Sequence, residues 1–177
     1  MSTTARWQVP TRMEMTGCDV FVGAMPIRLP PFSPRPLAPA LARMGAIHFY
    51  TVVQRPSPGG FPYVYFDFLP ESPEDPAVAF GALLGQRIPG IVQERNLRRL
   101  PTKSCWWIGK TAEDKGVESV REFNELWDKR LLLFRHDCRH YTDALVDHLT
   151  GEAGVIERVM ELKRNDVDAA QRFTEYD

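Results

Sequence analysis

The hydrophobic and polar positions along the chain predict two strands, a helix, a third strand, a second helix and finally a pair of carboxy-terminal helices. Residues 46–53 and 63–69 are rich in β-branched and aromatic side chains, which is typical of strands. The Pro- and Gly-rich residues 54–62 between them predict a long loop, so the two strands form an antiparallel hairpin. Residues 104–108 predict a further, buried strand.

Four segments have the apolar spacing of helices. Residues 77–86 follow an Asp-Pro start signal, and this helix is predicted to bury Phe80, Leu83 and Leu84. Residues 117–129 are amphipathic, residues 138–149 end at Gly151, and residues 152–173 form a second carboxy-terminal helix. Residues 88–101 have no clear pattern. They are the most basic stretch, which is either a solvated face or a patch that binds an anionic ligand.

The first 44 residues are rich in proline and predict an arm outside the domain. Five prolines lie between positions 30 and 39, where they favour extended or polyproline II structure. This arm either lies along the domain surface or offers an SH3-like domain a ligand. The predicted organisation is an arm (1–44), an α+β domain with a small antiparallel sheet packed against helices (45–151), and a carboxy-terminal helix (152–177).

Composition and charge argue against several classes of function. The chain has 177 residues and a net charge of -1, which argues against nucleic-acid binding driven by bulk charge. It lacks an apolar run near the roughly 20 residues that span a bilayer, and its three Cys fit a reducing compartment. We therefore expect an intracellular protein, in the cytoplasm or in an organelle, since the amino terminus has a weak targeting pattern. No phosphate-binding loop is present, and no cofactor is expected.

The residues around Cys138 in the sequence favour a reactive thiolate. It is predicted to start a helix, where free N–H groups and the helix dipole favour a thiolate, and Arg135, His136 and Arg139 add positive charge. Such a thiol is suited to act as a nucleophile. The alternative is a buried cysteine that serves as a small apolar residue.

A cysteine nucleophile needs a base, and His48 is the best candidate. It lies in an otherwise apolar strand, whereas His136 and His140 are too close to Cys138 in the chain to reach back to it. Asp67 lies inside the second strand and is a plausible cross-strand neighbour of His48 that would orient the imidazole. The alternatives are a core or edge histidine and an exposed strand-end aspartate.

A metal site is the competing use of the same residues. His136, Cys138 and His140 are three potential ligands at alternate positions. No second pair of Cys or His at zinc-like spacing completes the set, so no metal is expected.

The order of these parts resembles the circularly permuted papain-like cysteine enzymes. These include the lecithin retinol acyltransferase-like (NC-domain) proteins and the PPPDE isopeptidases. The matching motif is Asp137-Cys138-Arg139-His140-Tyr141, in which Cys, any residue, His and an aromatic residue open a helix, and the similarity covers about residues 45–151. The motif is also similar to D-C-R-H-Y segments of uncharacterised plant and algal proteins. Asp137 replaces the usual Asn, and the loop after the strand of His48 is longer than in the family.

The resemblance implies roles for three residues and supporting roles for the rest of the motif. Cys138 would be the nucleophile, His48 the general base and Asp67 the third polar group. The activity it implies is acyl transfer or hydrolysis through a thioester, on lipid esters or on peptide or isopeptide bonds. The alternative is an inactive module that binds a protein partner through the Pro-rich arm and the carboxy-terminal helix.

Overall fold

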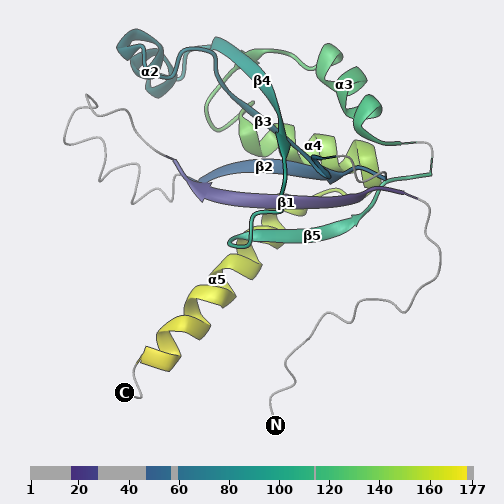
Figure 1. Cartoon of the computed structure of the whole chain (residues 1–177). Coiled ribbons are helices and arrows are strands. Elements are labelled where there is room, and N and C mark those ends of the chain that lie inside the picture. Colours follow the sequence, from purple (N-terminus) through teal and green to yellow (C-terminus); the bar gives the residue numbers. More distant parts are fainter. Residues whose placement is uncertain (1–16, 28–46, 57–59, 114, 175–177) are drawn as a thin grey trace, which may run out of the picture.

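The computed structural model describes residues 17–27, 47–56, 60–113 and 115–174, with side chains up to 164 (Figure 1). The predictions made for the prolines at 30–39 and for the targeting pattern lie outside these residues. Within them the fold is α+β, as predicted. It consists of a six-stranded antiparallel sheet and four helices.

The sheet has the strand order β5-β1-β2-β3-β4-β6. The strands are β1 (Asp19–Pro26), β2 (Ile47–Gln54), β3 (Tyr63–Pro70), β4 (Ile88–Leu97), β5 (Cys105–Lys110) and β6 (Arg130–Leu131). Strands β2 and β3 form the predicted hairpin, and β4 shows that residues 88–97 of the basic stretch without a clear pattern are a strand.

Strand β1 corrects the predicted boundary of the arm. Residues 19–26 were assigned to an arm outside the domain, but they pair with β2 on one side and β5 on the other. Val20, Val22 and Ala24 are buried at alternate positions. The assignment was wrong because the prolines that follow dominate the local pattern, whereas pairing with two strands distant in sequence stabilises β1.

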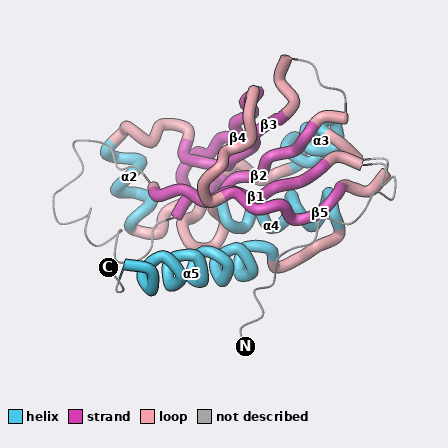
Figure 2. Tube along the Cα trace, turned by 60° about the horizontal axis from the view of Figure 1, so that its bottom comes forward, coloured by secondary structure: helices cyan, strands magenta, loops and turns pink. Residues whose placement is uncertain are grey.

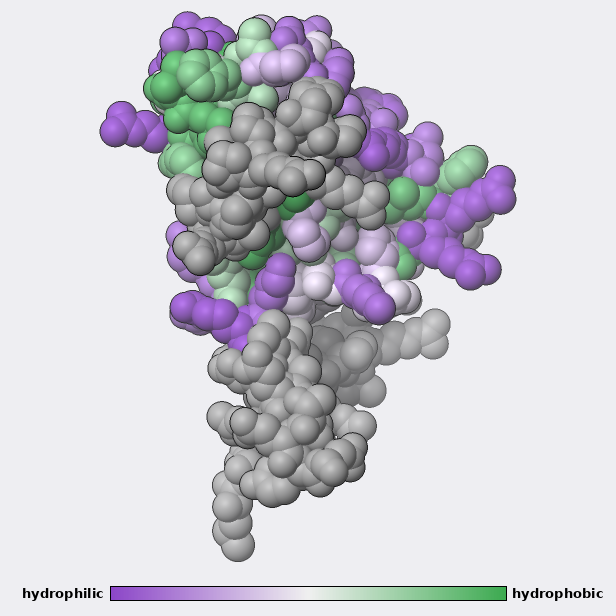
Figure 3. Space-filling view, turned by 90° about the vertical axis from the view of Figure 1, so that its left-hand side faces the viewer, coloured by the Kyte–Doolittle hydropathy of each residue, from purple (hydrophilic) through white to green (hydrophobic). Residues whose placement is uncertain are grey.

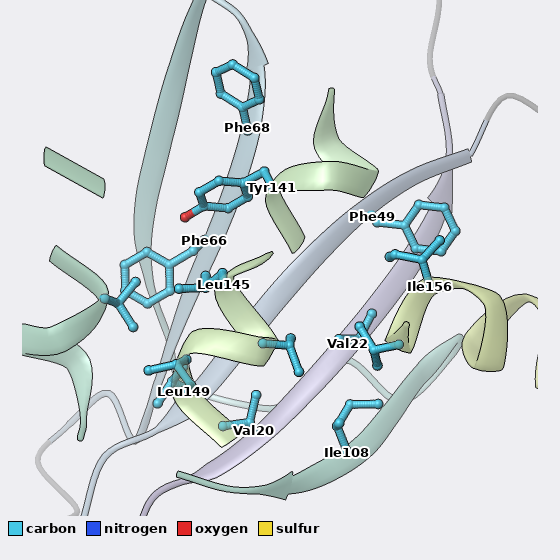
Figure 4. Close-up of a cluster of buried hydrophobic side chains, with 14 of the residues drawn as sticks. Val20, Val22, Phe49, Phe66, Phe68, Ile108, Tyr141, Leu145, Leu149 and Ile156 are labelled. Carbon is cyan, nitrogen blue, oxygen red and sulfur yellow. The ribbon is translucent and has the colours of Figure 1, made fainter. Parts of the chain in front are cut away.

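Three helices pack on one face of the sheet and form the main core. They are α3 (Val117–Leu126), α4 (Cys138–Thr150) and α5 (Val155–Thr174). Figures 1 and 2 place α4 against the strands, with α5 extending away from it. The side chains of α4 that enter the core are Tyr141, Leu145, Val146 and Leu149, and they meet Phe49, Phe66 and Phe68 from the sheet (Figure 4). Helix α4 ends as predicted at Gly151, which has a φ of 76°.

The other face of the sheet carries a smaller aromatic cluster. Its buried members are Tyr50, Val52 and Tyr65. Gly23 of β1 lies opposite Tyr50 of β2, and a Cβ atom at Gly23 would come within 2.0 Å of the Tyr50 ring. The ring therefore lies directly over the glycine, a close approach that a side chain at this position would prevent.

Strands β2 and β3 pair along only part of their length. Their pairing runs from Gln54 and Tyr63 to Thr51 and Phe66, and it ends there. Beyond this point β2 still pairs with β1 and β3 still pairs with β4. In Figure 1, β3 and β4 rise away from β2 toward α2, and α4 lies in the angle between them. The sheet is thus split at the end where His48 and Asp67 lie.

Helix α2 (Pro76–Leu83) differs from its prediction. Asp75 caps it as expected, accepting a hydrogen bond of 2.8 Å from the Ala77 N–H. However, Phe80, Leu83 and Leu84 are 63%, 39% and 61% exposed rather than buried. Figure 3 shows a hydrophobic area near the top of the molecule, the end at which Figure 1 places α2. Gly81 is the buried residue of this helix, because the helix turns a narrow face toward β4.

Strand β5 is also less buried than predicted. Ile108 is buried, but Trp107 is 47% exposed, because β5 is an edge strand with a single neighbour. Among the described residues, no helix is both long and apolar enough to cross a membrane.

Candidate active site

The start of helix α4 is fixed by Asp137, its N-cap residue. The Asp137 carboxylate accepts hydrogen bonds from the backbone N–H of Arg139 at 3.1 Å and of Phe134 at 2.9 Å. The side chain of His140 completes a capping box with the backbone of Asp137. Phe134 has a φ of 67°, so the turn before the helix is strained and is held by the same carboxylate. These bonds place Cys138 as the first residue of the helix.

The Asp137 carboxylate is buried, yet its environment favours the charged form. Burial raises its pKa, but hydrogen bonds from Arg139 and His140 lower it, and the net shift is downward. The Arg139 guanidinium contacts the carboxylate at 2.6 Å. Asp137 is therefore a charged helix cap paired with a cation.

His48 and Asp67 meet across the split in the sheet. The imidazole Nε2 of His48 lies 2.9 Å from Oδ2 of Asp67, as the predicted cross-strand contact required. The Asp67 side chain is 4% exposed and that of His48 is 16% exposed. The predicted alternative of an exposed aspartate at the strand end is therefore wrong.

Cys138 lies next to the imidazole of His48, and its interaction with the ring contributes to the pKa of His48. Burial lowers the pKa of His48, but the interactions with Asp67 and Cys138 outweigh this effect and raise it to about 9. His48 therefore carries its proton at neutral pH, and the thiol faces a cation. Since Nε2 contacts Asp67, the other ring nitrogen, Nδ1, is the one available to exchange a proton with the thiol.

The other two cysteines are in inert surroundings. Burial raises the pKa of the Cys18 thiol and raises that of Cys105 to about 11. Both shifts favour the unreactive protonated thiol. Of the three cysteines, Cys138 alone contacts an imidazole.

Tyr141 of the motif and the neighbouring His136 contact helix α3 and the residues just after it. Tyr141 is buried, and its hydroxyl donates to Asn124 at 2.7 Å. The ring of His136 stacks on Trp127 with centroids 4.5 Å apart, and its Nε2 contacts the Asp128 carbonyl at 2.7 Å. A ring nitrogen of His136 thus contacts Asp128, and a ring nitrogen of His140 contacts Asp137. Within the described ranges, no cluster of three His, Cys, Asp or Glu side chains is arranged to hold a metal.

One member of the site was missed in the sequence. The hydroxyl of Tyr65 donates a hydrogen bond of 2.7 Å to Oδ2 of Asp67, the same oxygen that contacts His48. The signal was present, since Tyr65 and Asp67 are two residues apart in one strand and so share a face. A tyrosine in an aromatic strand gives no sign of a polar role, which is why it was overlooked.

Comparisons of the chain with protein-family models, with curated proteins and with solved structures found no match.

Proposed function

We propose that the chain is a cysteine-dependent acyl hydrolase or acyltransferase that works through a thioester intermediate. The observation that carries the proposal is the contact of Cys138 with an imidazole that is itself held by a buried carboxylate. A thiol at a helix start beside an imidazolium is the arrangement that a cysteine nucleophile requires. The resemblance of the Asp137–Tyr141 motif to permuted papain-like enzymes supports the same reaction.

The reaction would proceed in two steps. The Cys138 thiolate attacks the substrate carbonyl, a C–S bond forms, and the carbonyl oxygen takes up the electron pair. The intermediate then expels the leaving group, which takes a proton from His48. In the second step, His48 accepts a proton from water or another acceptor as that group attacks the thioester, which releases the acid or the transferred acyl product and restores the thiolate.

The first turn of α4 offers a donor for the oxyanion. Asp137 accepts the N–H groups of Arg139 and His140 with its side chain and that of Tyr141 with its carbonyl. This leaves the Cys138 N–H as the first-turn donor without an acceptor among the described residues. It lies on the nucleophile itself, so it is suitably placed to stabilise the tetrahedral intermediate.

Trapping of the acyl-enzyme tests this function. We would incubate the protein with nitrophenyl esters of short and long acyl chains and with activated peptide esters, and map the acyl group by peptide mass spectrometry. The expected result is an acyl group on Cys138 that hydroxylamine removes. Cys138→Ala is expected to lose it, and Cys105→Ala to keep it. Full turnover by Cys138→Ala would overturn the proposal, and the preferred ester would separate lipid from peptide substrates.

The alternative is an inactive module that binds a partner. The observation in its favour is the exposure of two apolar side chains, Phe80 in α2 and Leu84 at the C-cap of α2. Iodoacetamide separates the two functions. If Cys138 reacts no faster near pH 7 than a free model thiol, the module is the better description.

A further inference from the structure

Asp67 is held by two hydrogen bonds that end on one oxygen. Oδ2 contacts His48 Nε2 at 2.9 Å and Tyr65 Oη at 2.7 Å. The second oxygen, Oδ1, is buried and lacks a hydrogen-bond partner within the described part of the chain. Among the described residues, Tyr65 is therefore the only group other than His48 that forms a hydrogen bond with this carboxylate.

The Tyr65 hydroxyl acts as a permanent donor. Burial and the nearby charge of Asp67 raise the pKa of Tyr65 far above its ordinary value, and the cation of Arg95 offsets this only in part. The phenol therefore stays protonated at neutral pH. The hydroxyl thus donates its hydrogen bond to Asp67 Oδ2 and does not lose its proton.

The ring of Tyr65 is held by its neighbours. Its centroid lies 4.7 Å from that of Tyr50, and the guanidinium of Arg95 lies 5.3 Å from its centre. The ring of Tyr50 in turn lies over Gly23. Aromatic packing on the face of the sheet opposite α4 thus fixes the position of the hydroxyl that contacts Asp67.

We propose that Tyr65 is a positioning residue of the active site, whose hydroxyl keeps the Asp67 carboxylate turned toward His48. The proposal rests on the proposed function, in which His48 must keep its ring orientation and its proton beside Cys138. Without the hydroxyl, Asp67 keeps only one hydrogen bond and its carboxylate is free to turn away from the imidazole. The imidazolium would then lose part of its stabilisation.

Titration of His48 by imidazole NMR tests the role of Tyr65. The titratable groups that act on His48 are Asp67 from β3 and Cys138 from α4. The wild-type His48 pKa is expected near 9. Asp67→Asn is expected to lower it by about 1–3 units, since a contacting carboxylate is lost. Tyr65→Phe is expected to lower it by roughly half a unit, the effect of one hydrogen bond.

Tyr63→Phe is the matched control, since Tyr63 lies on the same strand and face and packs on Phe21 with centroids 6.3 Å apart. It is expected to titrate like the wild type. Tyr65→Phe keeps the ring and its packing, so its unfolding transition should stay close to that of the wild type. An unchanged or raised His48 pKa in a folded Tyr65→Phe variant would overturn the positioning role, and Tyr65 would be a core residue only.

The titration distinguishes this proposal from the proposed function. It reads the environment of His48 without a substrate, so it remains informative even if no acyl-enzyme is trapped. Conversely, suppose that His48 in Tyr65→Phe titrates as in the wild type and that an acyl-enzyme is still trapped. The acyl chemistry would then stand, and only the positioning role of Tyr65 would be lost. Alkylation of Cys138 at pH 7 adds a second readout, which is expected to slow in Tyr65→Phe and to stay unchanged in Tyr63→Phe.

Discussion

His48 Nε2 and Asp67 Oδ2 lie 2.9 Å apart although 19 positions separate them in the chain. The contact crosses the point where β2 and β3 cease to pair. The same split gives the start of α4 access to the imidazole, since α4 packs on both strands. Two strands that paired along their whole length would leave no room there for the helix start. The split therefore allows Cys138, His48 and Asp67 to meet.

The raised pKa of His48 predicts a pH-dependent stability. Its pKa is about 9 in the folded protein and 6.5 in the unfolded chain. The resulting stabilisation is fully present below pH 6.5 and is lost as the pH rises through about 9. Its size is on the order of 1–3 kcal/mol.

Denaturant unfolding of the wild type and of Asp67→Asn at pH 6 and pH 10 measures this stabilisation. The gap in the free energy of unfolding between the two proteins should be wide at pH 6 and much narrower at pH 10. A gap of equal size at both values would show that the charge of His48 does not contribute.

The contacts of Asp137 predict that Asp137→Ala and Asp137→Asn differ in their free energy of unfolding. Asp137→Ala removes the helix cap and leaves the Phe134 N–H without its acceptor, so we expect a loss of about 2 kcal/mol or more in the free energy of unfolding. Asp137→Asn keeps a good N-cap residue and should lose less. Because the pKa of Asp137 is lowered, its stabilisation is present above its ordinary pKa of 3.8 and is lost as the pH falls.

Asp75→Ala is the matched control for Asp137. Asp75 also caps a helix with its carboxylate, but it is exposed and α2 has only 8 residues. Denaturant unfolding should show a cost of at most about 1 kcal/mol for this change. If Asp75→Ala costs as much as Asp137→Ala, the buried contacts of Asp137 add nothing beyond the cap.

Much of the fold could be predicted from the sequence where local signals agree with the final structure. The start and end of α4 follow from Asp137 and Gly151, which have the expected capping conformations. Strand β1 could not be predicted, because its stability comes from pairing with two partners distant in the chain. The exposure of Phe80 was missed because an apolar run shows that a helix forms but not how much of it another element covers.

The candidate site could be predicted in part. A histidine and an aspartate inside apolar strands are conspicuous, and a hairpin brings such residues together. The place of Cys138 beside them depends on the split between β2 and β3, which no local pattern encodes. Tyr65 was missed for a related reason, since its role depends on the exact direction of the Asp67 carboxylate.

The packing of α4 on the sheet predicts that truncation of Leu145 strongly lowers the stability of the protein. This side chain is fully buried between α4 and the sheet (Figure 4), so Leu145→Ala should cost about 2–5 kcal/mol through lost burial and a cavity. Leu126 at the end of α3 is 89% exposed, and Leu126→Ala should change stability by less than about 0.5 kcal/mol. Thermal or denaturant unfolding measures both. Equal effects would contradict the packing described for α4.

The contact between Gly23 and Tyr50 predicts that the smallest added side chain disturbs the site through the aromatic cluster of Tyr50 and Tyr65. In Gly23→Ala, the new Cβ would come within 2.0 Å of the Tyr50 ring, so the ring must move. We expect a loss of about 1–3 kcal/mol in the free energy of unfolding, the usual cost of overpacking. Because the Tyr50 ring packs on Tyr65, the movement should also change the titration of His48.

Gly109→Ala in β5 is the matched control, since a Cβ there meets no atom within 4 Å. It should be neutral or slightly stabilising, because alanine reduces the freedom of the unfolded chain. Unfolding curves and the His48 titration of the two variants complete the comparison. A Gly23→Ala protein as stable as Gly109→Ala, with an unchanged His48, would show that the Tyr50 ring moves freely and does not support Tyr65.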